Sequence, residues 1–446
     1  MNLFQSESDK YTKEQLSARE AQRLAEYIAW GPVIFQVSRL MVKWGVLEAL
    51  RDSIDGLTLN ELKAKTSLSE YALKILLEAS LSAGTILIDK DTDHYTISKA
   101  GWFLLNDPAT RVNIDFNHDV NYRGMFFLDE ALKEGKPAGL KTLGDWPTIY
   151  EGLSKLDKQV QESWFAFDHF YSDHSFDKAL EIVFSKRPKH LMDVGGNTGR
   201  FALRCVQYDA NVNVTIVDLP GQIGLMTKQI DGNEGAKRII GCPTNILDEH
   251  SKLPQGEWDA IWMSQFLDCF SEEEIYSILS RTAQVMHADT TLYIMETFWD
   301  RQKYEPASLC LTMTSVYFTA IANGNSKMYH SDDMVKQINR SGLKVVAVHD
   351  SIGQGHTILE VKLKNMMERK EIEEKVKAFL IEDLEIEEEN IAPEAKLKDD
   401  LGIDSLDFVD IVVIVEKNFG FKIKPEEMQG IVTLSQFCDY IESKVG

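Results

Sequence analysis

At 446 residues the chain is longer than a typical single domain, and its 44% hydrophobic and 26% charged residues are ordinary for a globular protein. The formal net charge of −22 argues against a nucleic-acid partner, because neutralising phosphate groups requires clustered Lys and Arg. A membrane-spanning helix needs about eighteen consecutive apolar residues, and the sequence has no such run, so no membrane partner is expected either.

The N-terminal residues and the spacing of the cysteines indicate in which compartment the protein works. Residues 1–10 are polar and lack the apolar stretch of a secretory signal. The five cysteines are scattered without a Cys-x-x-Cys pair: Cys205, Cys242, Cys269, Cys310 and Cys438. This pattern favours a reducing environment and supports neither a disulfide framework nor a metal site. We therefore expect a cytoplasmic protein without a metal.

The first segment, residues 1–110, is predicted to be a helical domain that ends in a small hairpin. Apolar residues recur at helical spacing between Leu16 and Met41, and a helix–turn–helix pattern covers residues 59–83. Two short strands, at 85–89 and 94–98, then complete the order of a winged helix. The would-be recognition helix carries two acids and one lysine among apolar residues, so dimerisation is a better use for it than DNA binding.

The second segment, residues 111–364, has the alternating pattern of an α/β domain. Its apolar strand candidates are residues 190–194, 212–218, 258–263, 291–296, 343–351 and 356–362. Helical stretches separate most of them, which predicts a doubly wound, Rossmann-like parallel sheet. Only residues 352–355 separate the last two, which predicts an antiparallel hairpin at a sheet edge.

The third segment, residues 371–446, is far more acidic than the rest of the chain. It contains 20 Asp and Glu against 8 Lys and Arg, a net charge of −12 out of the total of −22. This asymmetry indicates a separate module with its own partners. The stretch Asp399–Asp407 opens an amphipathic helix with Ser405 at its start, where a phosphate ester would meet free backbone N–H groups. The alternative is that Ser405 is the N-cap of a helix in an ordinary small bundle.

The most informative motif of the second segment is a strand followed by a glycine-rich turn. Gly195, Gly196 and Gly199 would let the backbone turn sharply and approach a ligand closely. The next strand ends on Asp218, whose carboxylate can accept hydrogen bonds from a ribose diol. Spacing alone leaves three interpretations open: a dinucleotide site, an adenosyl site, or a tight turn with an incidental acid.

With these motifs the chain resembles, over Leu16–Leu363, the O-methyltransferases that combine a winged-helix dimerisation domain with a class I methyltransferase fold. The resemblance rests on DVGGNTG (193–199), VDLP (217–220), DAIW (259–262) and YIME (293–296). It implies a homodimer that binds S-adenosyl-L-methionine. The residues implied to bind this cofactor are Asp193, Gly195, Gly196, Gly199, Asp218, Leu219, Asn245, Ile246 and Ser264. The family commonly has Asp at position 245 and Lys at position 264, so one cofactor contact is expected to be lost.

The chain departs from the family at its general base. Plant-type members have a histidine in a Leu-His-x-Trp-Ser-x-Glu motif, and Asp268 occupies that position here. The resemblance matches Glu296 to one acid that flanks the histidine, whereas residues 327–331 lack the second. His169, in an aromatic stretch that the family uses to line its substrate pocket, is the other candidate base, or else a hydrogen-bonded residue of a core helix. His330 is a weaker candidate in a polar loop.

Three roles are open for Asp268. An aspartate with a pKa near 4 is a weaker base than imidazole, but burial could raise its pKa and make it a useful proton acceptor. Asp268 could then serve as the base in methyl transfer to oxygen. It could instead help to ionise a phenol whose ortho carbon is methylated. The third alternative is a catalytically dead site.

The third segment resembles acyl carrier proteins over Glu371–Val445, which implies a four-helix bundle. In that family the serine of the Asp-Ser-Leu motif carries 4′-phosphopantetheine, added by a phosphopantetheinyl transferase, and Ser405 is the matching residue. The acids Asp407, Asp410 and Glu416 would suit docking to basic patches of biosynthetic partner enzymes. Fusion favours joint function, because tethering can raise an effective concentration to about the millimolar range.

Together these features predict a methyltransferase of secondary metabolism, with polyketide or aryl polyene biosynthesis as one setting. Its substrate would be an aromatic or phenolic intermediate, free or bound to the carrier as an acyl thioester. One rival hypothesis is a carrier or scaffold protein with an inactive methyltransferase-like domain, and another is a ligand-sensing DNA regulator. The choice between O- and C-methylation, and whether the carrier serves its own methyltransferase domain, stay open at this point.

Overall fold

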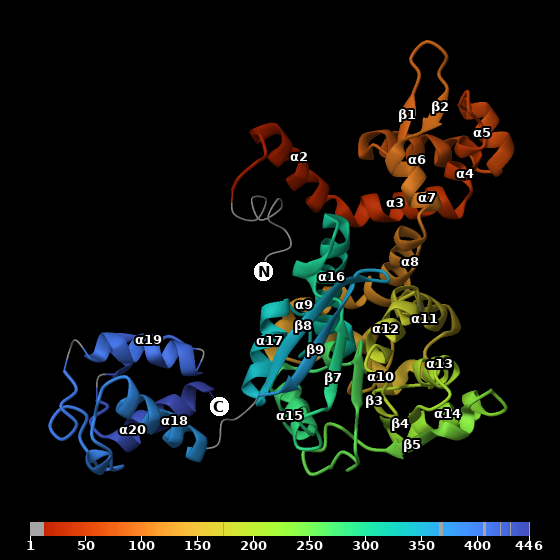
Figure 1. The fold of residues 1–446 in the computed structure, drawn as a ribbon. Coiled ribbons are helices and arrows are strands. Elements are labelled where there is room, and N and C mark those ends of the chain that lie inside the picture. Colours follow the sequence, from red (N-terminus) through yellow and green to blue (C-terminus); the bar gives the residue numbers. More distant parts are fainter. Residues whose placement is uncertain are drawn as a thin grey trace.

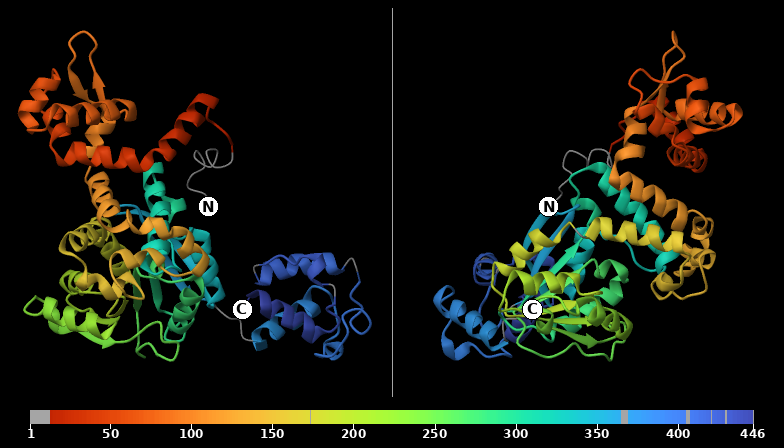
Figure 2. Two further views of the ribbon diagram at one scale, coloured as in Figure 1. Left: turned by 180° about the vertical axis from the view of Figure 1, so that it is seen from behind. Right: turned by 90° about the vertical axis from the view of Figure 1, so that its right-hand side faces the viewer.

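The computed structural model describes residues 13–172, 174–364, 369–404, 407–419, 421–428 and 430–445. Figures 1 and 2 show helices and a small hairpin at the N-terminal end, an α/β region around a large sheet, and a small C-terminal helical bundle. No helix in these ranges is both long and apolar enough to cross a membrane.

The N-terminal region has the helices and the hairpin that the sequence predicted. Its elements are α2 (Ala18–Ala29), α3 (Gly31–Lys43), α4 (Val46–Arg51), α5 (Leu59–Thr66), α6 (Glu70–Ala83), β1 (Ile86–Ile88), β2 (Tyr95–Ile97) and α7 (Lys99–Asn106). A capping box between Thr58 and Glu61 begins α5, and Gly84, with φ of +78°, ends α6. Among the described residues no side chain of α2 is buried, and its Leu24 and Ile28 are 51% and 71% exposed.

The sheet has seven strands in the order β5-β4-β3-β6-β7-β9-β8. They are β3 (His190–Val194), β4 (Asn213–Asp218), β5 (Ile239–Pro243), β6 (Ala260–Ser264), β7 (Thr291–Glu296), β8 (Leu343–Ile352) and β9 (His356–Leu363). Strands β3 to β7 are parallel, whereas β9 pairs antiparallel with both β7 and β8. The predicted parallel sheet and its antiparallel edge hairpin are confirmed. The sequence missed β5, because Gly241 interrupts its apolar run and weakens the strand signal.

Helices cover both faces of the sheet, which gives the predicted Rossmann-like layering. One face packs on α12 (Phe176–Phe184), α13 (Arg200–Tyr208) and α14 (Pro220–Ile230), and its core includes Trp262 and Tyr293. The other face packs on α15 (Glu272–Ala283) and α17 (Ser331–Arg340), and its core includes Met263 and Ile294. Successive strand residues therefore serve opposite cores, as the period of two requires.

A further group of helices forms its own apolar cluster. It comprises α8 (Pro108–Phe116), α9 (Leu128–Glu134), α10 (Ile149–Gly152), α11 (Lys158–Ser172), α16 (Glu305–Tyr317) and the π-helices η1 (Asn117–Asn121) and η8 (Phe318–Ala322). Short 3₁₀ turns connect the domain: η2 (Gly124–Phe127), η3 (Ala138–Thr142), η4 (Leu153–Lys155), η5 (Ala236–Arg238), η6 (Leu267–Cys269) and η7 (Trp299–Arg301). Cys269 of η6 packs against this cluster, so the cluster adjoins the end of β6.

The C-terminal bundle contains α18 (Arg369–Glu382), α19 (Asp407–Phe419) and α20 (Leu434–Val445), with the 3₁₀ turns η9 (Glu388–Asn390) and η10 (Pro425–Met428). Its core gathers apolar residues of all three helices, including Val376, Val415 and Phe437. On α19, Val409 and Val413 are each 61% exposed, one helical turn apart. The bundle therefore keeps an apolar strip on the helix that follows the Ser405 motif.

Candidate active site

The turn after β3 follows a path that requires glycine. Gly195 and Gly199 have φ values of +80° and +77°, in the left-handed region. A Cβ atom added to Gly195 would lie 2.3 Å from a carbon of the Phe266 ring. At Gly196 an added Cβ would lie 2.8 Å from a carboxyl oxygen of Asp193. The turn is thus closely packed as well as conformationally restricted.

Gly195→Ala is therefore expected to lower the free energy of unfolding by about 2–4 kcal/mol, combining left-handed backbone strain with the overlap against Phe266. Cofactor affinity should fall as well. Gly232→Ala is the matched control, since Gly232 has φ of +75° but no atom within 4 Å of an added Cβ. Chemical denaturation and calorimetric titration measure the two effects. Equal destabilisation of both variants would contradict the packing argument.

Asp218 connects the two loops that follow β3 and β4. Its carboxyl oxygens accept hydrogen bonds from the backbone N–H of Asn197 (2.8 Å) and of Leu219 (2.7 Å). Burial raises the pKa of Asp218 above its usual value, against these two hydrogen bonds. A carboxylate has about four acceptor positions, so Asp218 can still accept bonds from the two hydroxyls of a ribose.

Asp193 is a buried acid with an unused oxygen. It is 2% exposed, and its Oδ2 has no hydrogen-bond partner among the described residues. Burial, and next the charge of Asp218, raise the pKa of Asp193 to about 8. Such an orphaned oxygen behind the glycine turn suits a hydrogen-bond donor of a ligand.

Asp193→Asn should change how stability depends on pH. An unfolded aspartate titrates near 3.9, whereas folded Asp193 keeps its proton up to a pKa of about 8. The folded chain thus binds more protons across this window, and its stability falls as pH rises from about 4 to 8. The variant lacks this group. Its free energy of unfolding relative to that of the wild type should therefore be higher at pH 8 than at pH 4, by up to a few kcal/mol. Urea denaturation at several pH values tests this, and a pH-independent difference would contradict it.

Two buried carboxyl groups lie at the ends of β6 and β7. Glu296 ends β7, is 2% exposed, and accepts hydrogen bonds through Oε1 from the backbone N–H of Phe266 (3.0 Å) and Leu267 (2.8 Å). These bonds hold η6, which carries the buried Asp268, beside β7. Because Phe266 also contacts the turn at Gly195, the glycine turn and the two acids form one continuous site.

Burial controls the protonation of this pair. It raises the pKa of Asp268 to about 6, and the nearby charge of Asp168 contributes. It raises the pKa of Glu296 well above the usual value, with the charge of Asp268 as the next cause. Burial thus favours the protonated form of both groups, and a pKa of about 6 leaves Asp268 mostly ionised near neutral pH. In its ionised form Asp268 can accept a proton.

The sequence provided little or no indication that some residues lie close to Asp268. Cys269 Sγ donates to Asp268 Oδ1 at 3.5 Å, and the Tyr150 side chain hydrogen-bonds with Cys269. Asp168 belongs to the same aromatic stretch as His169, so its motif was visible although its role was not. Tyr150 lies in the short helix α10, more than a hundred residues from Asp268 in sequence, and only folding brings it to the site.

The two candidate histidines have other partners. His169 is exposed, and its Nδ1 lies 3.2 Å from Nη1 of Arg200. A guanidinium can only donate, so Nδ1 accepts this bond and is unavailable as a base. His330 Nδ1 accepts the N–H of Asp332 at 3.0 Å and caps α17. The geometry therefore favours Asp268 over both histidines.

The remaining residues that the sequence predicted to bind the cofactor lie at or after the carboxyl ends of strands in the same sheet. Ser264 is the last residue of β6. Asn245 follows β5, is exposed, and accepts the N–H of Leu247 at 3.1 Å. The Ile246 side chain belongs to the core instead. Ser405 lies outside the described residues.

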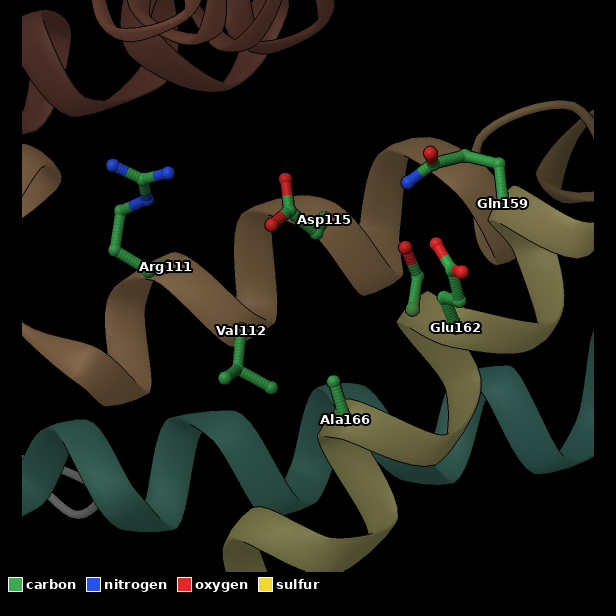
Figure 3. A pocket seen from close by; sticks show the side chains of 7 residues that line it. Arg111, Val112, Asp115, Gln159, Glu162 and Ala166 are labelled. Atoms are coloured by element: carbon green, nitrogen blue, oxygen red, sulfur yellow. The ribbon is translucent and has the colours of Figure 1, made fainter.

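Two surface hollows lie beside α11. One of about 430 Å³ lies between α8 and α11 (Figure 3), and the other has about 440 Å³. The first is lined by Arg111, Val112, Asp115, Gln159, Glu162, Ser163 and Ala166. The second contains Asp119, which bonds with His118 Nδ1 (2.6 Å) and Ser163 Oγ (2.5 Å). Neither hollow is lined by Asp268 or the glycine turn. Among the described residues, no group of His, Cys, Asp and Glu is arranged to hold a metal ion.

Three family models match successive parts of the chain. A Dimerisation2-like domain matches residues 22–95, an O-methyltransferase domain matches residues 149–339, and a phosphopantetheine attachment site matches residues 374–441. The acyl carrier protein of Thermotoga maritima is 44% identical over 81 residues, which cover 18% of this chain and 100% of that protein.

Solved structures share the fold of the first two regions. The apo S-adenosylmethionine-dependent methyltransferase SibL has a TM-score of 0.58 at 19% identity, covering 76% of this chain and 98% of SibL. The mitomycin 7-O-methyltransferase MmcR has a TM-score of 0.56 at 18% identity, covering 77% and 98%. The O-methyltransferase NcsB1, solved with S-adenosylmethionine and 2-hydroxy-5-methyl naphthoic acid, has a TM-score of 0.53 at 17% identity, covering 74% and 95%.

Proposed function

We propose that this chain methylates a phenolic acyl group carried on phosphopantetheine. The premise is that it joins a dimerisation domain and an O-methyltransferase domain to a member of the acyl carrier protein family. The observation that carries the proposal is the buried carboxylate Asp268, with a pKa of about 6, in one continuous site with the glycine turn. The proposed domains are residues 1–110, 111–364 and 371–446, and α2 supplies an apolar face for a homodimer.

The cofactor of this function is S-adenosyl-L-methionine, which supplies an electrophilic methyl group when bound. The residues present fit it. The orphaned oxygen of Asp193 and the glycine turn suit the amino-acid part, which carries an ammonium donor. Asp218 suits the ribose hydroxyls, and the loop with Asn245 suits the adenine. Leu219 and Ser264 complete the proposed set.

Asp268 is the proposed proton acceptor. Above pH 6 its carboxylate is ionised and can take the proton of a phenolic hydroxyl, so that the oxygen attacks the methyl carbon. S-adenosyl-L-methionine, when bound, would supply this methyl group and would be left as the neutral thioether. Glu296 acts as a positioning residue that holds η6 through two backbone N–H groups. His169 is retained only as a substrate-pocket residue, because Arg200 occupies its Nδ1.

The aromatic surroundings and two structural neighbours support the proposed substrate class. In the apolar cluster that adjoins Cys269, Phe116 stacks on Phe167 and meets Tyr317 edge to face, and such aromatic surroundings suit a flat ring. MmcR is named a mitomycin 7-O-methyltransferase, and NcsB1 was solved with a hydroxynaphthoic acid. We propose an aromatic hydroxyl as acceptor, within secondary metabolism and in the cytoplasm. Methyl transfer to a ring carbon is the other outcome of the test below.

The carrier domain supplies the second prosthetic group. Ser405 is the proposed attachment site of 4′-phosphopantetheine, added by a phosphopantetheinyl transferase. The backbone next to it is organised by a reciprocal pair: the N–H of Asp404 donates to Asp407 (2.9 Å), and the N–H of Asp407 donates to Asp404 (3.1 Å). This pair begins α19, as a capping interaction does. Partner enzymes would load and unload the arm.

The test is mass spectrometry of the full chain with a 4-hydroxybenzoyl arm installed from its coenzyme A thioester. Incubation with S-adenosyl-L-methionine should add one methyl group to the ejected arm, and fragmentation distinguishes O-methyl from ring C-methyl. A parallel assay offers free phenolic acids. If native protein carries an arm on Ser405 but methylates neither tethered nor free phenols, the carrier or scaffold alternative replaces this proposal.

A further inference from the structure

Cys269 follows Asp268 in η6, and its side chain contacts the carboxyl group directly. The thiol is partly buried and packs against the apolar cluster that contains Phe116. Its Sγ lies 3.5 Å from Oδ1 of Asp268 and donates to it, since an ionised carboxylate can only accept hydrogen bonds. The candidate base therefore has a side-chain donor on the residue next to it.

Tyr150 continues this chain of hydrogen bonds. Its hydroxyl group hydrogen-bonds with the sulfur of Cys269. A thiol has a single hydrogen, which here is donated to Asp268, so the sulfur accepts and the phenol of Tyr150 donates. The neighbouring Ile149 is completely buried in the same apolar cluster and holds α10 in place. Two donors thus follow one another toward the carboxylate, first a phenol and then a thiol.

The backbone around η6 is anchored at both ends, which places the thiol beside the carboxyl group. Glu296 of β7 accepts the two backbone N–H groups at its start, as described above. At its other end, Asn323 Nδ2 donates to the carbonyl oxygen of Cys269 at 2.7 Å. Tyr329 Oη donates to the carbonyl oxygen of Phe270 at 2.6 Å. Because three segments distant in sequence hold this turn, the arrangement of thiol and carboxyl group is a property of the fold.

The charged neighbours of Asp268 oppose its ionisation. Burial is the main cause of its raised pKa, and the charge of Asp168 on α11 adds to it. Glu296 is the second acid, and its own pKa is raised by burial and next by the charge of Asp268. Two further titratable neighbours, Tyr317 and Tyr329, are neutral phenols whose pKa values burial raises. Hydrogen-bond donors must therefore support the ionised form of the base.

The thiol of Cys269 provides the strongest of these donors. Against the larger effect of burial, its hydrogen bond lowers the pKa of Asp268 more than any other hydrogen bond does. Burial, and next the charge of Asp268, raise the pKa of the thiol itself well above its usual value. Cys269 therefore keeps its hydrogen near neutral pH and remains a donor while Asp268 is ionised.

From this geometry we infer that Cys269 and Tyr150 are positioning residues, which hold the carboxylate of Asp268 ionised and oriented to accept a proton. They act through the hydrogen bonds that run from phenol to thiol to carboxylate. The inference rests on the proposed function for the role of Asp268 as the base. The coupling between thiol and carboxylate does not depend on that function, because it can be measured without any methyl transfer.

Cys269→Ala tests the role in the reaction. Without the thiol donor, the acid limb of the single-turnover rate should move to higher pH by about half to one unit, because the ionised form loses one hydrogen bond. Cys269→Ser keeps a donor, so its acid limb should stay closer to that of the wild type. Tyr150→Phe should move the limb in the same direction as Cys269→Ala, but less, since it removes the donor one step further away.

Cys310→Ala is the matched control for these variants. Cys310 is also partly buried, and its sulfur accepts a hydrogen bond from Asn113 Nδ2 at 3.4 Å, outside the chain that leads to Asp268. Its loss should leave the acid limb in place. A lower rate in Cys269→Ala with an unmoved acid limb would assign Cys269 a structural role only and would overturn the inference.

Alkylation of Cys269 tests the coupling by itself. The full chain is treated with iodoacetamide at several pH values above neutral, and peptide mass spectrometry gives the labelling rate of Cys269, with Cys310 in the same samples as reference. The thiolate is the reactive form, and the charge of Asp268 disfavours it, so Asp268→Asn should speed the labelling by about threefold or more. Tyr150→Phe should slow it, because the thiolate loses the phenol donor.

The two measurements separate the inference from the proposed function. Labelling of Cys269 that is the same in Asp268→Asn and in the wild type, relative to Cys310, would overturn the inference even if the chain methylates phenols. Labelling that responds as expected, in a chain that transfers no methyl group to any phenol, would support the coupling and count against the proposed function alone.

Discussion

Asp268→Asn is expected to lower the rate of methyl transfer to a phenol by about 10²–10⁴-fold, the range for loss of a general base. The amide keeps the size of the side chain but cannot accept the phenolic proton. Cofactor affinity should change little, because Asp268 lies in η6 and outside the glycine turn. Single-turnover kinetics and calorimetric titration with S-adenosyl-L-methionine measure the two quantities.

Glu273→Gln is the matched control for this substitution. Glu273 lies five residues further along the chain, its side chain is 74% exposed, and it pairs with Arg340 at the surface. Its loss should leave the rate within a factor of about two, since surface ion pairs contribute little. His169→Gln should also have a small effect. A variant Asp268→Asn with nearly full activity, alongside an inactive His169→Gln, would reverse the assignment of the base.

The pH dependence of the wild type follows from the same group. As the proposed base, Asp268 would work only when ionised, and its pKa is about 6. The single-turnover rate should therefore be level above about pH 7 and fall about tenfold per pH unit well below 6. In Asp268→Asn this acid limb should disappear, so the variant and the wild type should converge at low pH. The pH at which the rate begins to fall is informative, because a base with an unshifted aspartate pKa would stay active down to about pH 4.

Ser405→Ala has the second large expected effect. Without the hydroxyl no phosphopantetheine can be attached, so turnover of a tethered 4-hydroxybenzoyl group should be abolished. Turnover of a free phenol at saturating concentration should stay within a factor of about two. The difference arises because the tether supplies an effective concentration of about the millimolar range, which a dilute free substrate lacks.

Ser443→Ala is the control, because Ser443 is an exposed serine of α20 in the same domain and bonds only to the carbonyl oxygen of Tyr440 at 2.6 Å among the described contacts. Intact-mass measurement after treatment with a phosphopantetheinyl transferase reports the loading of both variants. Arm attachment in Ser405→Ala would place the modified serine elsewhere. Equal methyl transfer by Ser405→Ala and Ser443→Ala, after both are treated with the transferase and the 4-hydroxybenzoyl coenzyme A thioester, would exclude the tethered-substrate model.

Replacing a family histidine with a buried aspartate has a physical logic in this fold. Imidazole titrates near neutral pH without help, whereas a carboxyl group needs burial to reach a pKa of about 6. Glu296 contributes by fixing η6 through Phe266 and Leu267. Burial also raises the pKa of Glu296 well above its usual value, which disfavours a second negative charge beside Asp268.

Local patterns in the sequence determined much of the architecture. Strands 190–194 and 291–296, helix 59–66 and the edge hairpin were visible because apolar periodicity and turn residues act over a few neighbouring positions. The glycine turn could be predicted for the same reason, because the positive φ values at Gly195 and Gly199 favour glycine at these positions. Strand β5 was missed where Gly241 weakened that local signal.

The chemistry of the site was decided only by tertiary structure. Asp268, Asp193 and Glu296 were recognisable as acids, but their protonation depends on burial, which is produced by segments far away in the chain. His169 and Asp268 were rival candidate bases in the sequence, and only the folded structure shows that Arg200 lies beside His169. The sequence directly determines residue types and favours local secondary structure. The dielectric environment of a side chain and the direction of a segment are determined only when distant segments pack together.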